Sequence, residues 1–343
     1  MTRIVATVGP ACSSEAGLTD LLKAGVDQFR FTASKTPVAR LIPLAETVRR
    51  LAGDLGREVE LLIDLPGAKT RLTNDDYLDL AGVTELVLSF DGRPGQPAGP
   101  TPTLGVDGRD ARDPLPGIGD IVVVGDGEDA LRVVAVGLDS CTVTPLTRGV
   151  LGIRRGVQFP GATRAGGFTG YDLDGLRAVA GGPFDAVIIS FAESAGQVEQ
   201  ARALLRQSAA VIAKIETGAG ARAAAEIAGA ADGILLGRGD LLLDTGVIEF
   251  YAAYRRVLDA AHAAGCPVLV GTQLLTSLAA GWLPHRSELA HVSALIEEGV
   301  AGLMLAEETA GADDPVRAVA LLDDLRGVYA PAATRTPLFA RRR

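Results

Sequence analysis

The stretch that decides the fold is AVIAKIETGAGARAAAEIAGAADGILLGRGDLL, residues 210–242. Two apolar runs, AVIAKIE and GILLGRGD, flank a segment rich in alanine and glycine. Continuous apolar runs of this length are typical of strands buried on both faces of a parallel sheet. The first run ends with Lys214 and Glu216, and the second with Arg238 and Asp240. The stretch therefore predicts two neighbouring buried strands with charged residues at their carboxyl ends.

Six more apolar runs of this kind occur, separated by amphipathic segments such as SAGQVEQARALLRQ. The predicted strands are RIVATVG (3–9), DQFRFTA (27–33), VELLIDLPG (59–67), DAVIISF (185–191), AVIAKIE (210–216), GILLGRGD (233–240), PVLVGTQ (267–273) and GLMLAEE (302–308). Alternating strands and helices imply a parallel sheet. Eight such units predict an α/β fold, a (β/α)₈ or TIM barrel, whose catalytic groups lie at the carboxyl ends of the strands.

One interval between the third and fourth predicted strands breaks this rhythm. Residues 72–160 hold a Pro/Gly-rich loop and then short apolar runs separated by Gly-Asp turns, with no helical pattern. This predicts a small all-β, barrel-like domain inserted after the third strand, with residues 1–71 and 161–331 forming the barrel. Residues 332–343 are expected to be a frayed C-terminal tail.

Composition narrows the function classes. The 343 residues are 48% hydrophobic and 22% charged, with a net charge of −9, which argues against a nucleic-acid-binding protein. The three cysteines have no CxxC spacing, so neither a disulfide framework nor a zinc site is expected. No window approaches the length of a membrane-spanning helix, and no signal peptide is apparent. These features predict a soluble, cytoplasmic protein.

The strand-end charges predict a site. Residues two apart on a strand share a face, so Lys214 and Glu216 are expected to point the same way, as are Arg238 and Asp240. Two carboxylates, Glu216 and Asp240, on adjacent strands suit Mg²⁺. The other polar residues expected at this edge are Arg30, Ser34, Asp64, Lys69, Arg71 and Glu308. The alternative, a set of structural salt bridges closing the barrel, stays open.

Several segments resemble motifs of the pyruvate kinase family, in the family's order. TRIVATVGPACSS resembles T-K-I-V-x-T-x-G-P, IAKIET resembles I-x-K-I-E, and DGILLGRGDL resembles D-G-I-M-V-A-R-G-D-L. PVLVGTQLLTSL and LPHRSELAHVSALIEEGVAGLMLAEETAGADDPVRAV resemble P-V-x-x-A-T-Q-M-L-x-S-M and the family's P-T-R-A-E to G-E-T-A segment. The inserted domain falls where the family has its lid. The family's usual C-terminal regulatory domain is expected to be missing.

The resemblance implies roles for individual residues. Glu216 and Asp240 would hold Mg²⁺, or Mn²⁺. Lys214 would be catalytic, offsetting negative charge on the phosphoryl group in transfer and on the enolate oxygen. Thr272 would assist protonation of the enolate carbon, and Arg30 would grip the phosphoryl group. The expected substrate-binding residues are Arg30, Arg71, Ser190, Gly239, Asp240 and Thr272.

Departures from the family pattern bear on potassium and the nucleotide. Lys69 replaces the acidic residue of the family's G-P-E-I-R, and its ammonium can stand where a potassium ion would bind. Lys69, with Asp64 and Ser34, therefore predicts potassium independence. Further departures are Lys35, Pro66, Gly125, Glu193 and His291, and several of them are expected to flank the nucleotide or the phosphate path.

The resemblance implies Mg²⁺-dependent phosphoryl transfer between phosphoenolpyruvate and a nucleoside diphosphate, giving pyruvate. Two alternatives stay open: an Mg²⁺-dependent aldolase or lyase that uses the pyruvate enolate as a carbon nucleophile, and a non-catalytic, metabolite-binding descendant. The expected partners are phosphoenolpyruvate or pyruvate, with ADP or ATP as a further small-molecule ligand. Apolar helix faces make a homodimer one further expectation, whereas no nucleic acid or membrane partner is expected.

Overall fold

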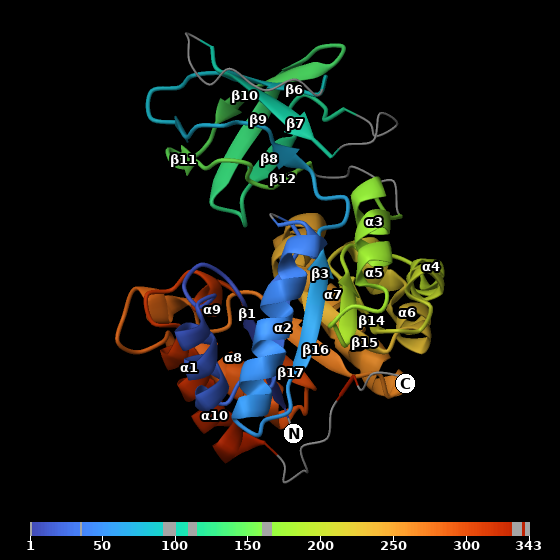
Figure 1. The fold of residues 1–343 in the computed structure, drawn as a ribbon. Coiled ribbons are helices and arrows are strands. Elements are labelled where there is room, and N and C mark those ends of the chain that lie inside the picture. Colours follow the sequence, from blue (N-terminus) through green and yellow to red (C-terminus); the bar gives the residue numbers. More distant parts are fainter. Residues whose placement is uncertain are drawn as a thin grey trace. The chain divides into compact units, whose positions relative to one another are not determined.

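Eight parallel strands close into a barrel (Figure 1). The computed structural model describes residues 2–34, 36–91, 101–108, 115–159, 167–330 and 338–339. The chain divides into two compact units: Met1–Gly67, Phe168–Arg238 and Tyr251–Arg343 form the first, and Ala68–Gly167 with Gly239–Phe250 form the second.

The barrel belongs to the first unit and has the strand order β1-β17-β16-β15-β14-β13-β3-β2. Its strands are β1 (Arg3–Thr7), β2 (Gln28–Thr32), β3 (Glu60–Leu65), β13 (Ala186–Ile189), β14 (Ala210–Ile215), β15 (Gly233–Gly237), β16 (Val268–Gly271) and β17 (Gly302–Leu305). These are the eight predicted strands, and the TIM-barrel prediction is confirmed. Each strand ends before its apolar run does, because the last residues of each run turn into the following loop or helix.

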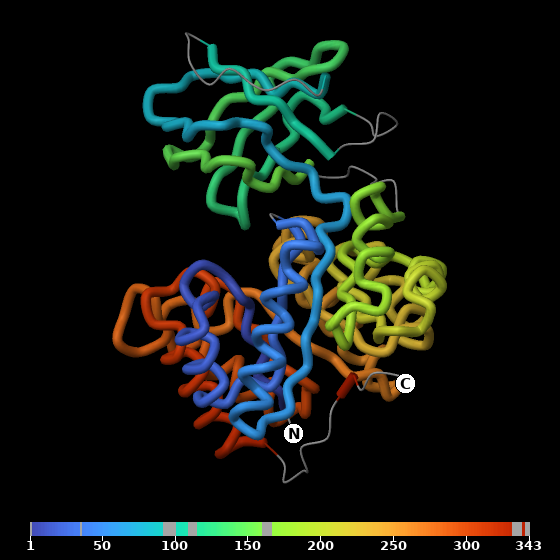
Figure 2. Tube along the Cα trace, in the orientation of Figure 1, coloured from blue at the N-terminus to red at the C-terminus, as the bar shows by residue number. Residues whose placement is uncertain are grey.

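Helices cover the barrel strands (Figure 1). They are α1 (Glu15–Ala24), α2 (Val38–Asp54), α3 (Gly170–Val179), α4 (Ala195–Leu205), α5 (Gly218–Arg222), α6 (Ala224–Ala230), α7 (Arg238–Ala264), α8 (Arg286–Glu297), α9 (Glu307–Ala310) and α10 (Pro315–Tyr329), with a 3₁₀ turn, η1, at Thr276–Ala279. Although α1 and α10 come from opposite parts of the sequence, they pack side by side (Figure 2).

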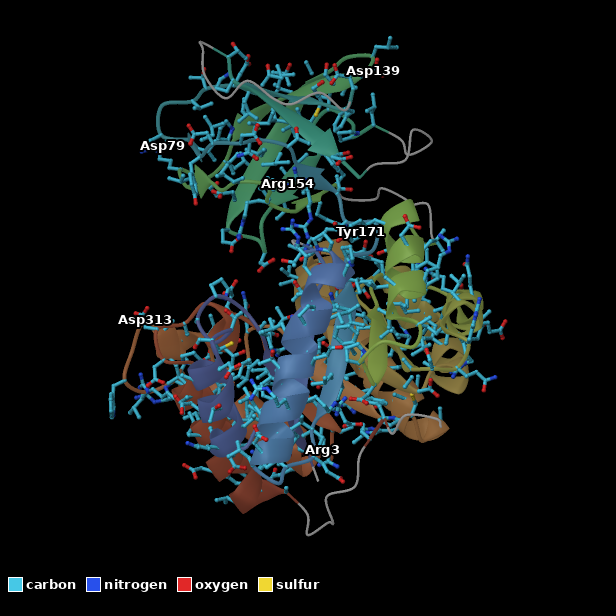
Figure 3. All side chains as sticks on the ribbon, in the orientation of Figure 1. Arg3, Asp79, Asp139, Arg154, Tyr171 and Asp313 are labelled. Carbon is cyan, nitrogen blue, oxygen red and sulfur yellow. The ribbon has the colours of Figure 1, made fainter. Side chains whose placement is uncertain are left out.

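Local sequence signals explain where several helices begin. Ser14 caps α1 by accepting a hydrogen bond from the Gly17 amide. At α3, Thr169 and Asp172 form a capping box, in which each side chain accepts the other residue's backbone N–H. Tyr171, labelled in Figure 3 at the start of α3, donates its hydroxyl hydrogen to the Ala33 carbonyl at 2.9 Å. The helix is therefore tied to the loop after β2.

One sequence expectation at β15 is wrong. This strand ends at Gly237, and α7 begins at Arg238, so Arg238 and Asp240 lie in the first turn of a helix. Residues two apart on a helix do not share a face. Arg238 and Asp240 are therefore not two side chains on the same side of a strand, and they have different partners.

Most of the second unit consists of β-strands. A seven-stranded sheet has the order β12-β8-β9-β10-β6-β7-β4, and β5 pairs with β11. The strands are β4 (Arg71–Leu72), β5 (Leu78–Asp79), β6 (Leu86–Ser89), β7 (Thr103–Asp107), β8 (Ile121–Val124), β9 (Asp129–Val136), β10 (Ser140–Pro145), β11 (Val150–Leu151) and β12 (Val157–Gln158). Leu86, Leu104, Leu131 and Val143 lie in its fully buried core. This supports the inserted all-β domain, while its predicted limits, 72–160, stay a prediction.

The barrel interior holds an unexpected residue, Phe339. It is 3% exposed and packs in one apolar cluster with strand residues that include Val5, Leu62, Leu235 and Leu269. The expectation of a frayed tail is therefore wrong at this residue. The rest of the predicted tail, apart from Leu338, lies outside the described residues, as does Lys35. None of the helices in the described part of the chain combines the length and apolar character needed to cross a membrane.

Candidate active site

Lys214 lies at the centre of a cluster of polar side chains at the carboxyl ends of the barrel strands. It is near the end of β14, and its Nζ lies 3.0 Å from Glu216 Oε2 and 4.0 Å from Asp64 Oδ2. The Ser190 hydroxyl, just after β13, is 3.4 Å from the same nitrogen. As predicted from strand alternation, Lys214 and Glu216 lie on one side of the chain. One ammonium thus lies close to two carboxylates.

Arg30 reaches the same cluster from β2. Its Nε and Nη2 donate to Asp64 Oδ2 at 2.8 and 2.5 Å, and its Nη1 donates to the Thr7 hydroxyl at 3.1 Å. Burial would raise the pKa of Asp64, but the charges of Lys214 and Arg30 outweigh it and lower that pKa below its ordinary value of 3.8. Asp64 is therefore a buried, ionised anchor for the Arg30 guanidinium.

The backbone around Glu216 leaves room for its carboxylate and binds it. Glu216 is 1% exposed, and its Oε1 accepts the Phe191 amide hydrogen at 3.1 Å. Phe191 has a φ of 55°, in the left-handed region that a residue with a side chain seldom adopts. A Cβ at Gly237 would lie 2.9 Å from Glu216 Oε2 and 3.3 Å from Lys214 Cε. Glycine at the end of β15 therefore allows this ion pair to fit beside the strand.

The second unit contains another group of predicted site residues. Lys69 Nζ lies 2.9 Å from Asp240 Oδ2. Burial lowers the pKa of Arg71, and the nearby carboxylates of Asp240 and Asp126 act in the opposite direction. Asp240 therefore lies within electrostatic reach of two cations, Lys69 and Arg71.

The remaining predicted residues are spread over both units. Thr272 follows β16 and has a φ of 74°. The Ser34 hydroxyl is exposed and lies 3.2 Å from that of Thr32. Gly239 is in the first turn of α7. Ser34 and Asp64 belong to the first unit and Lys69 to the second, so their predicted grouping stays a prediction.

Glu308 is bound by backbone amides, and His291 is kept uncharged by its surroundings. Glu308 is 6% exposed, and its carboxylate accepts the Leu274 and Leu275 amide hydrogens at 3.0 and 3.2 Å. Burial, together with the charge of Arg238, lowers the pKa of His291 to about 4. At neutral pH the His291 imidazole is therefore uncharged.

Glu216 and Asp240 are the predicted metal ligands, and their chemistry fits a hard divalent cation. Both supply carboxylate oxygens, which Mg²⁺ prefers. Within the described ranges, no group of three or more His, Cys, Asp or Glu side chains is arranged to hold a metal ion. Glu216 belongs to the first unit and Asp240 to the second, so their joint binding of a metal ion stays a prediction.

Three residues at the site make contacts that the sequence did not predict. Thr7 binds Arg30, Phe191 binds Glu216, and Arg238 binds the Gly271 carbonyl at 2.9 Å. Thr7 is the last residue of β1, so its position at a strand end was the signal that could have found it. No local sequence pattern predicts the contacts of Phe191 and Arg238, because both depend on a left-handed backbone conformation.

The chain is similar to proteins named pyruvate kinase. The family model described as "Pyruvate kinase, barrel domain" matches residues 1–319. The pyruvate kinase of Thermococcus litoralis is 30% identical over 330 residues, covering 94% of this chain and 68% of the relative. That of Aeropyrum pernix is 31% identical over 341 residues, covering 98% and 72%, and that of Encephalitozoon cuniculi is 29% identical over 325 residues, covering 93% and 73%.

These matches bear on the predicted enzyme class. The relatives carry the name of a phosphotransferase, which confirms the prediction of an enzyme of that class. The family model covers the barrel and the inserted unit in one continuous match. From the barrel, the strand-end residues and these matches together, the chain belongs to the pyruvate kinase family.

Proposed function

We propose that the protein catalyses Mg²⁺-dependent phosphoryl transfer between phosphoenolpyruvate and a nucleoside diphosphate, with pyruvate as a product. The observation that carries the proposal is the Lys214 ammonium, 3.0 Å from Glu216 and 4.0 Å from Asp64 at the carboxyl end of the barrel. A fixed positive charge here would stabilise negative charge that develops on the transferred group and on the enolate oxygen. Lys214 would therefore be the catalytic cation.

Arg30 would bind the phosphoryl group. Its guanidinium is held by Asp64 and Thr7, so its orientation is fixed before substrate arrives. Its side chain is 14% exposed, which leaves part of it open to a ligand. A guanidinium suits phosphate oxygens because its N–H groups form a planar fork. Ser190, between Lys214 and Asp64, would orient the substrate by hydrogen bonding.

The other proposed residues would act on the pyruvate part and the cation. Thr272 would help to deliver the proton to the enolate carbon. The amides of Gly239 and Asp240, at the start of α7, would bind the carboxylate, as helix N-termini bind anions. Glu216 and Asp240 would hold the divalent cation, which when bound would polarise the substrate oxygens and neutralise their charge.

Lys69 supports potassium independence. Its ammonium lies 2.9 Å from Asp240 and is 19% exposed, so a positive charge is already fixed beside this proposed ligand. A monovalent cation bound from solution would duplicate that charge. The protein should therefore work without added potassium.

The reaction can be tested by NMR in potassium-free D₂O buffer with Mg²⁺, phosphoenolpyruvate and ADP. We expect ATP in the phosphorus spectrum and pyruvate in the proton spectrum to appear at the same rate. A parallel sample with pyruvate alone monitors exchange of its methyl protons. Exchange without consumption of phosphoenolpyruvate would favour an enolising aldolase or lyase instead. No change in either sample would overturn the proposal.

The role of Lys69 is tested by Lys69→Glu, with Lys69→Met as the matched control. A glutamate beside Asp240 would place two carboxylates together, and a potassium ion would relieve their repulsion. We expect potassium to raise the turnover of Lys69→Glu by about tenfold or more, which corresponds to about 1.4 kcal/mol. Wild type should not respond at constant ionic strength. Equal potassium responses in both proteins would contradict this assignment.

A further inference from the structure

Two successive residues after β16 have an unfavourable backbone conformation. Thr272 has a φ of 74° and Gln273 a φ of 51°, and both carry side chains that disfavour this left-handed region. Such a conformation persists only where surrounding contacts impose it, and it is common at functional sites. The structure should therefore contain groups that hold these residues in place.

Arg238 is one such group. Its Nε donates to the Gly271 carbonyl at 2.9 Å, while Nη2 donates to the Thr272 carbonyl and to the Gln273 carbonyl, the latter at 3.2 Å. In an extended chain, successive carbonyls point in alternate directions. The left-handed turn brings three successive carbonyls to one guanidinium, whose planar fork of donors can bind them together.

The Glu308 carboxylate binds the residues that follow the turn by accepting hydrogen bonds from their backbone amides. Its Oε1 accepts the Leu274 and Leu275 amide hydrogens at 3.0 and 3.2 Å and the Thr276 hydroxyl hydrogen at 2.9 Å. Its Oε2 accepts the Ala306 amide hydrogen at 2.8 Å. A cation thus binds the carbonyls of the turn and a buried carboxylate binds the amides that follow it.

The Thr272 hydroxyl is left available by this arrangement. Thr272 is partly exposed, and its hydroxyl makes no hydrogen bond with the described residues. Its direction is therefore set by the backbone turn rather than by partners of its own. We infer that Arg238 is a positioning residue, which fixes the left-handed turn at Thr272 and Gln273 and so aims the Thr272 hydroxyl at the reacting carbon. This inference rests on the proposed function.

The catalytic part is tested with Arg238→Met, Thr272→Val and the double variant, using pyruvate formation and methyl-proton exchange. Because a misplaced hydroxyl can cost about 100-fold in rate, we expect each single variant to lose about 10- to 100-fold in kcat with less than a threefold change in KM. The double variant should be no slower than Thr272→Val alone. Additive losses would mean that Arg238 does not act through Thr272, and would overturn the inference.

Two further variants separate positioning from general structural support. Arg238→Lys keeps the charge but lacks the planar fork, so it should not restore the rate. Arg255→Met makes the same substitution in the part of α7 that follows the non-helical residue Gly246, at a side chain that binds Asp259 and Glu298, and it should leave kcat unchanged. Full activity of Arg238→Lys would mean that charge alone is required, against the inference.

A measurement of stability tests the turn without relying on activity. Glycine adopts the left-handed region freely, so Gln273→Gly should raise the midpoint of thermal unfolding in wild type. In Arg238→Met the turn is free to relax, so Gln273→Gly should raise the midpoint of thermal unfolding less in this background. An equal gain in both backgrounds would overturn the inference, whether or not the enzyme turns over. An inactive wild type would instead overturn the proposed function, and with it the catalytic part.

Discussion

The two ends of the barrel each bury an ion pair, and the pairs differ in how far the cation is exposed. At the carboxyl end Lys214 pairs with Glu216, and at the amino end Arg326 pairs with Asp27. Both acids are nearly inaccessible, with side chains 1% and 6% exposed. The cations are not alike, since Lys214 is 17% exposed and Arg326 only 1%.

Arg326 has a protein acceptor at every donor of its guanidinium. Its Nε binds Asp323 at 2.7 Å, Nη1 binds Asp27 and the Thr2 carbonyl, and Nη2 binds Asp323 and the Gly25 carbonyl. The Lys214 Nζ lies 3.0 Å from Glu216, 3.4 Å from Ser190 and 4.0 Å from Asp64, and the side chain is 17% exposed. The difference in exposure indicates that Arg326 ties the structure together, whereas a ligand can reach Lys214. This agrees with the usual division of TIM barrels into a catalytic and a stabilising face.

Replacing Lys214 tests the carboxyl end and should have the largest effect. Lys214→Met removes the charge opposite the developing enolate and phosphoryl charge, so kcat should fall by about 10²–10³-fold. The NMR assay described above measures this loss of kcat, at a temperature below the midpoint of thermal unfolding of the variant. Lys23→Met, an exposed lysine at the end of α1, is the matched control. If Lys214→Met kept wild-type kcat, the carboxyl-end pair would be structural like the other one.

Replacing Arg326 tests the amino end. Arg326→Met leaves Asp27 buried without its strongest partner, and breaking a buried ion pair costs about 3–5 kcal/mol. Urea denaturation should show this loss, while kcat of the folded protein stays within about twofold because the residue is remote from the reacting groups. Arg177→Met, whose side chain is 59% exposed, should cost less than about 0.5 kcal/mol. A loss of kcat in folded Arg326→Met would remove the distinction between the two ends.

The sequence predicted the barrel and the Lys214–Glu216 pair for the same reason. Buried parallel strands need apolar residues on both faces, so each strand appears in the sequence as a continuous run of apolar residues. Alternation within the strand then places residues two apart on one side. Both inferences depend only on local geometry, and both survive in the structure.

Features set by distant parts of the chain could not be predicted. Phe339 is buried because Gly233 on β15 has no side chain, and a Cβ there would lie 2.8 Å from the Phe339 ring. Arg238 was placed on a strand because its apolar run continues through it, but the helix begins there. Its actual partners, the carbonyls of residues 271–273, face it only because of the left-handed turn. Neither the glycine–phenylalanine fit nor the turn leaves a periodic signal in sequence.

The stability that Asp64 contributes at the carboxyl end of the barrel should depend on pH. The pKa of Asp64 is lowered in the folded protein, although burial alone would raise it, because Lys214 and Arg30 stabilise the carboxylate. Its contribution is therefore complete above the ordinary value of 3.8, and it is lost as pH falls through the lower folded pKa. Asp64→Asn keeps the shape but cannot ionise, so it should cost about 1–3 kcal/mol at pH 7, and less below pH 4.

Urea denaturation of both proteins from pH 7 down to pH 3 measures that difference. The two stability curves should converge on the acid side, because wild type loses its Asp64 contribution there and the variant has none to lose. Asp174→Asn, with a side chain 80% exposed, controls for the loss of one carboxylate and should run parallel to wild type. Curves for Asp64→Asn and wild type that stayed parallel over this range would mean that Asp64 is not held ionised by its two cations. The Arg30 guanidinium would then lack the fixed anchor on which its proposed grip of the phosphoryl group depends.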